Sequence, residues 1–328
     1  MRLLTFVATF AASLFVGQAA FSQDARQVRL AHVAPPGTAW DNAANALAKD
    51  VTDKFGGRFK MTVFPSAQLG NEARMLQQVQ TGALDMAFLT VAEPLNKIND
   101  LGVLYAPFLV DSVEEAEKVL NGKVAKGLLD RFPKELGVIS LGYAMGGRRV
   151  ILTNFEFNGI DDMQGRKLRI TPVLPADDFY RLLGATPTPI PLPNLFDALA
   201  NRQVDGVDME LEVIAAVRLQ DHASHLYVTY HQLNPMVAVV SRNFWGSLTD
   251  EERQSFNELV DKSLAKIFAL QFASEKRIVG ELQKDKIKVI VSGPERFGGA
   301  LEKWDNIWSK KSSLLSDIRA EVNRIRSK

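Results

Sequence analysis

The chain has 328 residues, 46% of them hydrophobic and 23% charged, which is long enough for two globular domains of roughly 100–200 residues each. Its 39 Lys and Arg residues nearly balance its 38 Asp and Glu residues. This balance argues against nucleic acid as the main partner, because phosphate binding needs a basic excess. The lack of cysteine excludes disulfides, zinc–thiolate sites and a lipid-modified cysteine.

Residues 1–22 carry the pattern of a secretory signal peptide. Arg2 gives a positively charged start, residues 3–16 form an apolar run, and small residues follow up to Ser22. The run is shorter than the roughly 20 apolar residues that a membrane-spanning helix needs. We therefore predict that the chain is secreted into the bacterial periplasm and that the mature protein is soluble. The cleavage site within the small residues is left open.

Short β-type runs then alternate with amphipathic helices, which predicts an α/β fold with a parallel sheet covered on both faces. The rhythm restarts after Gly146-Gly147. We expect strands at 28–33, 59–64, 85–89, 151–153, 167–170, 188–190 and 207–209, and helices at 41–55, 70–81, 112–120, 124–131, 175–183, 195–201 and 211–220.

The last third of the chain is predicted to be helical. Thr249 followed by Glu252 forms a capping box at the start of a long helix that reaches about Asp285. A short strand at 287–291 and further helix from residue 294 complete the chain. A helix of that length would brace two domains.

The pattern predicts a two-lobed clamshell with a hinge. We place the domain boundary near residues 143–148 and a crossing back near 230–235. The predicted lobes are residues 23–146 with about 235–274 for lobe I, and residues 147–234 with about 275–328 for lobe II.

Motifs for common catalytic chemistry are absent from the sequence, including the P-loop, the dinucleotide fingerprint, the nucleophile elbow and the zinc-protease helix. His222 and His225 lie close enough to share a helix face, but no third metal ligand is near them in the sequence. We expect no cofactor, no bound metal and no enzymatic activity.

Four segments in a characteristic order resemble the substrate-binding proteins of tripartite ATP-independent periplasmic (TRAP) transporters, the DctP-like family. The first contains Phe-Pro-Ser-Ala-Gln-Leu-Gly and the third ends in Val-Asp-Gly. The resemblance implies a periplasmic-binding-protein clamshell that closes over a carboxylate ligand and passes it to a membrane permease. The segments are residues 64–85, 149–170, 184–206 and 245–252.

Two arginines are the leading ligand contacts that the resemblance implies. Arg169 matches the family arginine that forms a salt bridge with the substrate carboxylate. A guanidinium suits this role because its rigid fork matches the two carboxylate oxygens. Arg149 matches a second cationic contact, and its neighbour Arg148 is the alternative for that position.

Further candidates surround these arginines. Glu72 and Arg74 follow the Gln-Leu-Gly turn, where the family often contacts the ligand. Trp40, Phe108 and Tyr143 are candidates for the apolar wall of the pocket. Asn234 suits a hydrogen-bonding loop. Three carboxylates in one region have the chemistry to receive hydroxyls or an ammonium, or to be solvated at a helix start: Asp208, Glu210 and Glu212.

Met209 departs from the family pattern. Many relatives place an asparagine here that hydrogen-bonds the ligand, and a thioether cannot replace the donors and acceptor of an amide. The ligand therefore either lacks the group that the amide would recognise or uses another residue.

These observations predict a monomeric receptor for a small organic acid, with sugar acids or hydroxy acids slightly favoured, that delivers its ligand to TRAP permease subunits. Two alternatives are left open. A receptor of an ATP-driven importer would share the clamshell but not the motif order. A periplasmic enzyme would turn over the bound compound.

Overall fold

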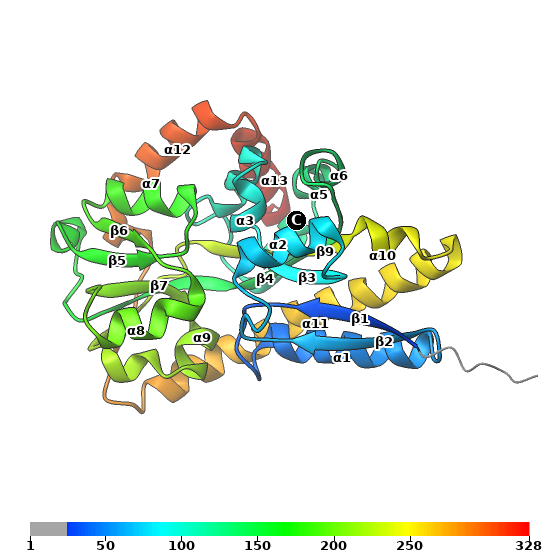
Figure 1. Cartoon of the computed structure of the whole chain (residues 1–328). Helices are drawn as coiled ribbons and strands as arrows, with labels where there is room; N and C mark the ends of the chain where they lie inside the picture. The colour runs from blue at the N-terminus through cyan, green and yellow to red at the C-terminus, as the bar shows by residue number, and fades with distance from the viewer. Residues whose placement is uncertain (1–24, 328) are drawn as a thin grey trace, which may run out of the picture.

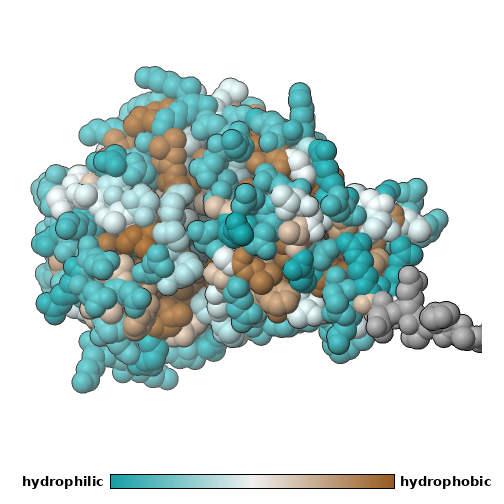
Figure 2. Space-filling view, viewed as in Figure 1, coloured by the Kyte–Doolittle hydropathy of each residue, from teal (hydrophilic) through white to brown (hydrophobic). Residues whose placement is uncertain are grey.

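The computed structural model describes residues 25–327, so the predicted signal peptide lies outside the described residues. The described chain is a mixed α/β fold in which two sheets share one strand (Figure 1). None of its helices within 25–327 has the length and apolarity needed to cross a bilayer. Hydrophilic residues cover most of the face seen in Figure 2, where hydrophobic residues form separate patches.

The first sheet has the strand order β2-β1-β3-β9-β4. Its first three strands are parallel, as predicted, whereas β9 runs antiparallel to both β3 and β4. All nine residues of β9 are buried because the strand is central. The strands are β1 (Arg26–Ala31), β2 (Phe59–Phe64), β3 (Met86–Thr90), β4 (Val138–Thr153) and β9 (Leu233–Ser241).

The second sheet continues from the far end of β4 in the order β4-β7-β5-β6, with β8 and β10 on the other edge of β4. Pro187 and Pro189 lie in the edge strand β6, where the missing backbone N–H groups are tolerated. The strands are β5 (Lys167–Ile170), β6 (Thr186–Pro189), β7 (Gly206–Glu210), β8 (His225–Val228) and β10 (Lys288–Val291).

Strand β4 corrects one expectation, because the sheet is mixed rather than parallel. Residues 143–148, where we expect the domain boundary, lie inside this 16-residue strand, which pairs with β9 up to Arg148 and with β7 from Arg149. β-Bulges next to Gly142 and Gly147 bend this strand, and both glycines have a positive φ of 147° and 141°. Strands β8 and β9 were not predicted. The lobe boundaries and the hinge motion stay predictions.

The helices cover the sheets at almost the predicted positions. Those at 41–55, 112–120, 175–183 and 195–201 are shifted by only one or two residues. The helices are α1 (Ala39–Lys54), α2 (Glu72–Thr81), α3 (Ala92–Leu95), α4 (Val113–Leu120), α5 (Lys123–Leu129), α6 (Phe132–Glu135), α7 (Leu174–Leu182), α8 (Leu195–Ala200), α9 (Leu211–Ala216), α10 (Arg242–Gly246), α11 (Asp250–Leu282), α12 (Ala300–Lys311) and α13 (Leu314–Arg326).

Helix α11 is the predicted long helix, and its capping box is confirmed. The Thr249 hydroxyl accepts a bond from the backbone N–H of Glu252, and the Glu252 carboxylate accepts one from the N–H of Thr249. The helix has 33 residues, which makes it about 50 Å long at 1.5 Å per residue. It packs on α1, on β4 and on α9 (Figure 1). It therefore contacts elements of both sheets.

Replacement of Thr249 by alanine is expected to destabilise the protein by about 1 kcal/mol, because the first turn of α11 loses its side-chain acceptor. Urea unfolding followed by circular dichroism measures this loss. Ser313→Ala is the matched control, because Ser313 precedes α13 and its hydroxyl makes no capping bond. Equal losses in the two variants would contradict the capping argument.

Candidate functional site

A cavity of about 240 Å³ lies where strands of both sheets end. The carboxyl ends of β3 and β7 reach it through Thr90 and Glu210. Val33, two residues after β1, and Thr171, directly after β5, also line it. Crevices at the carboxyl ends of parallel strands are the usual ligand sites of α/β sheets. The cavity is therefore the candidate binding site.

Six of the residues predicted from the sequence line this cavity. Trp40 and Glu72 come from the first turns of α1 and α2, and Asn234 comes from β9. On the other side are Arg149, Arg169 and Met209, from β4, β5 and β7.

The other four predicted residues do not line it. Arg74 is exposed on α2, where its guanidinium lies 3.4 Å from the side-chain oxygen of Gln77. Tyr143 lines a separate cavity of about 580 Å³ beside α11. Phe108 packs edge-on against Phe297, with the ring centroids 5.5 Å apart. Asp208 is buried behind the cavity.

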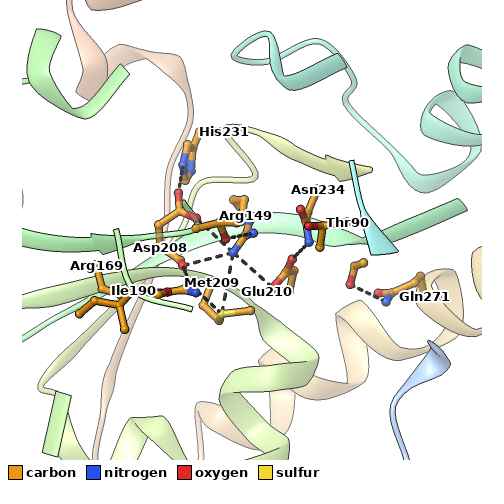
Figure 3. Close-up of polar contacts among 12 residues, drawn as sticks. Thr90, Arg149, Arg169, Ile190, Asp208, Met209, Glu210, His231, Asn234 and Gln271 are labelled. Atoms are coloured by element: carbon orange, nitrogen blue, oxygen red, sulfur yellow. Dashed lines mark hydrogen bonds and ion pairs between the residues drawn. The ribbon is translucent and has the colours of Figure 1, made fainter. Parts of the chain in front are cut away.

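Arg149 is a buried cation that the protein itself neutralises. Its Nη1 lies 3.2 Å from Oδ1 of Asp208 and 3.4 Å from Oε2 of Glu210, and its Nη2 donates to the Thr171 hydroxyl at 2.7 Å (Figure 3). Burial alone would lower the pKa of Arg149, but the attraction of Glu210 and Asp208 outweighs it and raises the pKa. The pairing follows from strand register, because Arg149 lies opposite Glu210.

Arg169 is buried to a similar degree but is paired differently. Its Nε donates to the carbonyl oxygen of Ile190 at 2.9 Å, and its Nη1 lies 3.2 Å from the carbonyl oxygen of Asp208 and 3.5 Å from the sulfur of Met209. Across residues 25–327, no carboxylate lies within 4.0 Å of its guanidinium and Nη2 makes no hydrogen bond. Burial, and then repulsion from Arg149, lower the pKa of Arg169 to about 10.

Arg148 points away from the cavity, which favours Arg149 over its neighbour. Its Nε donates to Glu275 on α11 at 3.1 Å, and its guanidinium stacks 3.8 Å from the ring centroid of Tyr230. Alternation of side chains along β4 accounts for the difference, because adjacent residues face opposite sides of a strand.

Asp208 holds the arginines in place from behind. Its carbonyl oxygen accepts from both Arg149 and Arg169, at 3.2 Å each. Its carboxylate lies 3.1 Å from Nε2 of His231 and accepts a bond from the hydroxyl of Tyr180 at 2.9 Å. Burial would raise the pKa of Asp208, but Arg149 and His231 outweigh this and lower it. Asp208 is thus an ionised anchor for the arginines.

The opposite side of the cavity carries carboxylates. Glu72 accepts from the backbone N–H and from the hydroxyl of Thr90, the latter at 2.7 Å. Burial raises the pKa of Glu72 to about 7, in spite of these bonds. Glu212 accepts a hydrogen bond from the backbone N–H of Ala39 at 3.1 Å and one from the side chain of Gln271 at 2.9 Å. It therefore links α9 to the first residue of α1 and to the middle of α11. Burial also raises the pKa of Glu212.

Several lining residues were not singled out from the sequence. Thr90, Thr171 and Glu93 contribute polar groups to the cavity. The signal that could have found them is position, because Thr90 ends β3 and Thr171 directly follows β5. No group of three metal-ligating side chains occurs between residues 25 and 327.

The chain is similar to known solute-binding proteins along most of its length. It is 26% identical to the sialic acid-binding periplasmic protein SiaP of Vibrio cholerae over 251 residues, 76% of this chain and 78% of the relative. Two solved TRAP periplasmic solute-binding proteins superimpose with TM-scores of 0.84. One, from Bordetella, is 27% identical and has density assigned to pantoate. The other, from a Polaromonas species, is 25% identical and was solved bound to D-erythronate.

These structural matches are nearly complete. The match with the Bordetella protein includes 89% of this chain and 98% of the Bordetella chain. The match with the Polaromonas protein includes 90% of this chain and 98% of the Polaromonas chain. A family model described as "Bacterial extracellular solute-binding protein, family 7" matches residues 30–313, which include every residue that lines the cavity. The chain therefore belongs to the DctP family of bacterial extracellular solute-binding proteins.

Proposed function

We propose that this protein is a periplasmic receptor that binds a small organic acid in the cavity and delivers it to a TRAP-type permease. One observation carries the proposal. Arg169 is a buried guanidinium that lines the cavity and has no carboxylate within 4.0 Å among the described side chains. A ligand carboxylate would supply the missing negative charge.

The contrast between the two arginines supports a single anion position. Asp208 and Glu210 already neutralise Arg149. Arg169 keeps a guanidinium edge for the ligand, and a planar fork binds the two oxygens of a carboxylate in parallel. Since burial excludes competing water, such a pair is stronger here than on the surface.

The compounds named for the relatives support an organic acid as the ligand of this protein. D-erythronate and pantoate are assigned to the two solved relatives, and sialic acid is named for the Vibrio cholerae protein. Each of these compounds combines a carboxylate with hydroxyl groups. Sugar acids and hydroxy acids are therefore the finer class that we propose, because the acceptor-rich side of the cavity would receive hydroxyl donors.

The mechanism that we propose is conformational. The ligand joins residues of the two sheets, so it favours the closed arrangement to the extent that it binds that arrangement more tightly. The permease then recognises the closed receptor. An enzyme with the same fold would change the compound, so recovery of the bound acid chemically unchanged after release supports the receptor.

The buried charged groups of the cavity lower the stability of the unliganded protein, as is common in binding sites. Glu72 and Glu212 are carboxylates whose pKa values burial raises, and Arg169 is a cation whose pKa burial lowers. All three charges are held in the cavity without a full complement of opposite charge. Groups perturbed by desolvation in a cleft are typical of functional sites.

Replacement of Arg169 by lysine is expected to weaken binding of an organic acid by about 100-fold. The variant keeps the positive charge but loses one of two charge-assisted bonds, worth about 3 kcal/mol. Isothermal titration with acids that raise the melting temperature of the wild type measures this loss.

Arg74→Lys is the matched control, because Arg74 is exposed and does not line the cavity. Unchanged affinity in Arg169→Lys, or an equal loss in the control, would remove Arg169 from the proposed role. A panel in which only neutral solutes stabilise the wild type would contradict the organic-acid receptor.

Replacement of Glu72 by glutamine is expected to make the unliganded protein less sensitive to pH. The folded protein holds the proton of Glu72 up to a pKa of about 7, against an ordinary value of 4.5 in the unfolded chain. Raising the pH through this window therefore removes stability from the wild type. The stability of Glu72→Gln relative to the wild type should rise by about 1–3 kcal/mol between pH 5 and pH 8. Urea unfolding at both pH values tests this, and a constant difference would refute it.

A further inference from the structure

The side of the cavity opposite Arg169 carries two acceptor atoms that receive no hydrogen bond from the described residues, although one of them, Oε2 of Glu210, lies 3.4 Å from Nη1 of Arg149. Glu210 is 2% exposed, and its Oε1 accepts from the amide nitrogen of Asn234. Within residues 25–327, Oε2 of Glu210 and Oδ1 of Asn234, which is 4% exposed, receive no hydrogen bond. Both residues line the cavity. In Figure 3 they lie on the far side of Arg149 from Arg169.

An aromatic ring completes this acceptor side. The backbone of Gly146 passes so close that a Cβ atom there would lie 2.7 Å from Nδ2 of Asn234, 3.3 Å from Oε1 of Glu210 and 3.4 Å from Cζ2 of Trp40. The three side chains therefore gather around one point. The indole N–H of Trp40 is already bonded to the carbonyl oxygen of Met145 at 2.9 Å, so the part of Trp40 that is left for a ligand is the carbon framework of its ring. A carboxylate, an amide oxygen and an indole ring together form a typical cation-binding set.

The charges of the cavity favour an ammonium over a hydroxyl group on the ligand. Both groups donate hydrogen bonds to Glu210 and Asn234, but only an ammonium adds positive charge. Arg149 and Arg169 face the carboxylates of Asp208 and Glu210, two charges of each sign. A ligand with only a carboxylate would pair with Arg169 but leave this group with a surplus of one negative charge. A ligand that also carries an ammonium leaves no surplus.

Arg149 does not remove this surplus. It is the cation nearest to Glu210, at 3.4 Å, but it lies closer to Asp208, at 3.2 Å, so one charge faces two carboxylates.

We propose that the ligand is an amino-bearing organic acid whose carboxylate binds Arg169 and whose ammonium binds between Glu210, Asn234 and the ring of Trp40. The proposal rests on the proposed function and narrows it, because hydroxyl groups elsewhere on the acid stay compatible with the cavity. Glu210 is then the residue that sets specificity for the amino group.

Matched pairs of acids that differ only in an amino or a hydroxyl group test this inference. Suitable pairs are serine and glycerate, and 4-aminobutanoate and 4-hydroxybutanoate, measured at pH 7 by thermal shift and isothermal titration. The amino member of at least one pair is expected to bind at least tenfold more tightly. In Glu210→Gln, which keeps the acceptor for Asn234 but removes the charge, this preference should fall at least tenfold while affinity for the hydroxy member persists.

Glu275→Gln is the matched control, because Glu275 pairs with Arg148 outside the cavity, and it should leave the preference unchanged. Circular dichroism of the unliganded variants confirms that they fold. If hydroxy acids or simple acids such as succinate bind and no amino acid binds more tightly than its partner, the inference fails and the proposed function stands. An equal loss for both members in Glu210→Gln also overturns it. If no acid of any kind binds, the proposed function fails as well.

Discussion

The ion pairs of Arg149 with Asp208 and Glu210 are the interaction on which the cavity depends. A buried charge costs several kcal/mol unless an opposite charge and hydrogen bonds compensate it. Here the compensation comes from register, because Arg149 of β4 lies opposite Glu210 of β7. By neutralising one arginine internally, the protein leaves the other, Arg169, without a carboxylate partner among the described residues, and this is the cation that we propose for the ligand. The two guanidiniums therefore differ in their pairing, although both are nearly fully buried.

Strand β4 gives this arrangement its position in the fold. One end of the strand pairs with β9 in the first sheet, and the other pairs with β7 and β8 in the second. Arg149 follows the second bulge of this strand, close to the place where the pairing changes. The cavity thus lies beside the strand that connects the sheets, and α11 packs across the same junction.

Local patterns in the sequence were sufficient for most elements but not for the strands at the centre. Helices were found because apolar spacing, the Thr249 capping box and stops such as Gly56-Gly57 are local signals. β9 was missed because a strand buried on both faces shows no alternation, and its antiparallel pairing with β3 depends on residues about 150 positions away in the chain. The continuity of β4 was missed because Gly146-Gly147 resembles a linker, whereas here it allows a bulge.

The residues of the candidate site likewise differ in whether local sequence was enough to find them. Arg149, Arg169 and Met209 were found through the family motifs, and each lines the cavity, as does Trp40, which was selected only as an aromatic residue. Tyr143 and Phe108 were selected as aromatic residues in plausible segments, but side-chain direction in a bent strand or at a positive φ is set by tertiary structure. The excess of carboxylates was visible as Glu210 and Glu212, yet its meaning depends on which charges they meet. Only the three-dimensional arrangement shows that Arg149 lies between Asp208 and Glu210, and that an oxygen of Glu210 and an oxygen of Asn234 receive no hydrogen bond from the described residues. The information on the class of ligand therefore lies in the balance of charges inside the cavity, which the sequence alone does not give.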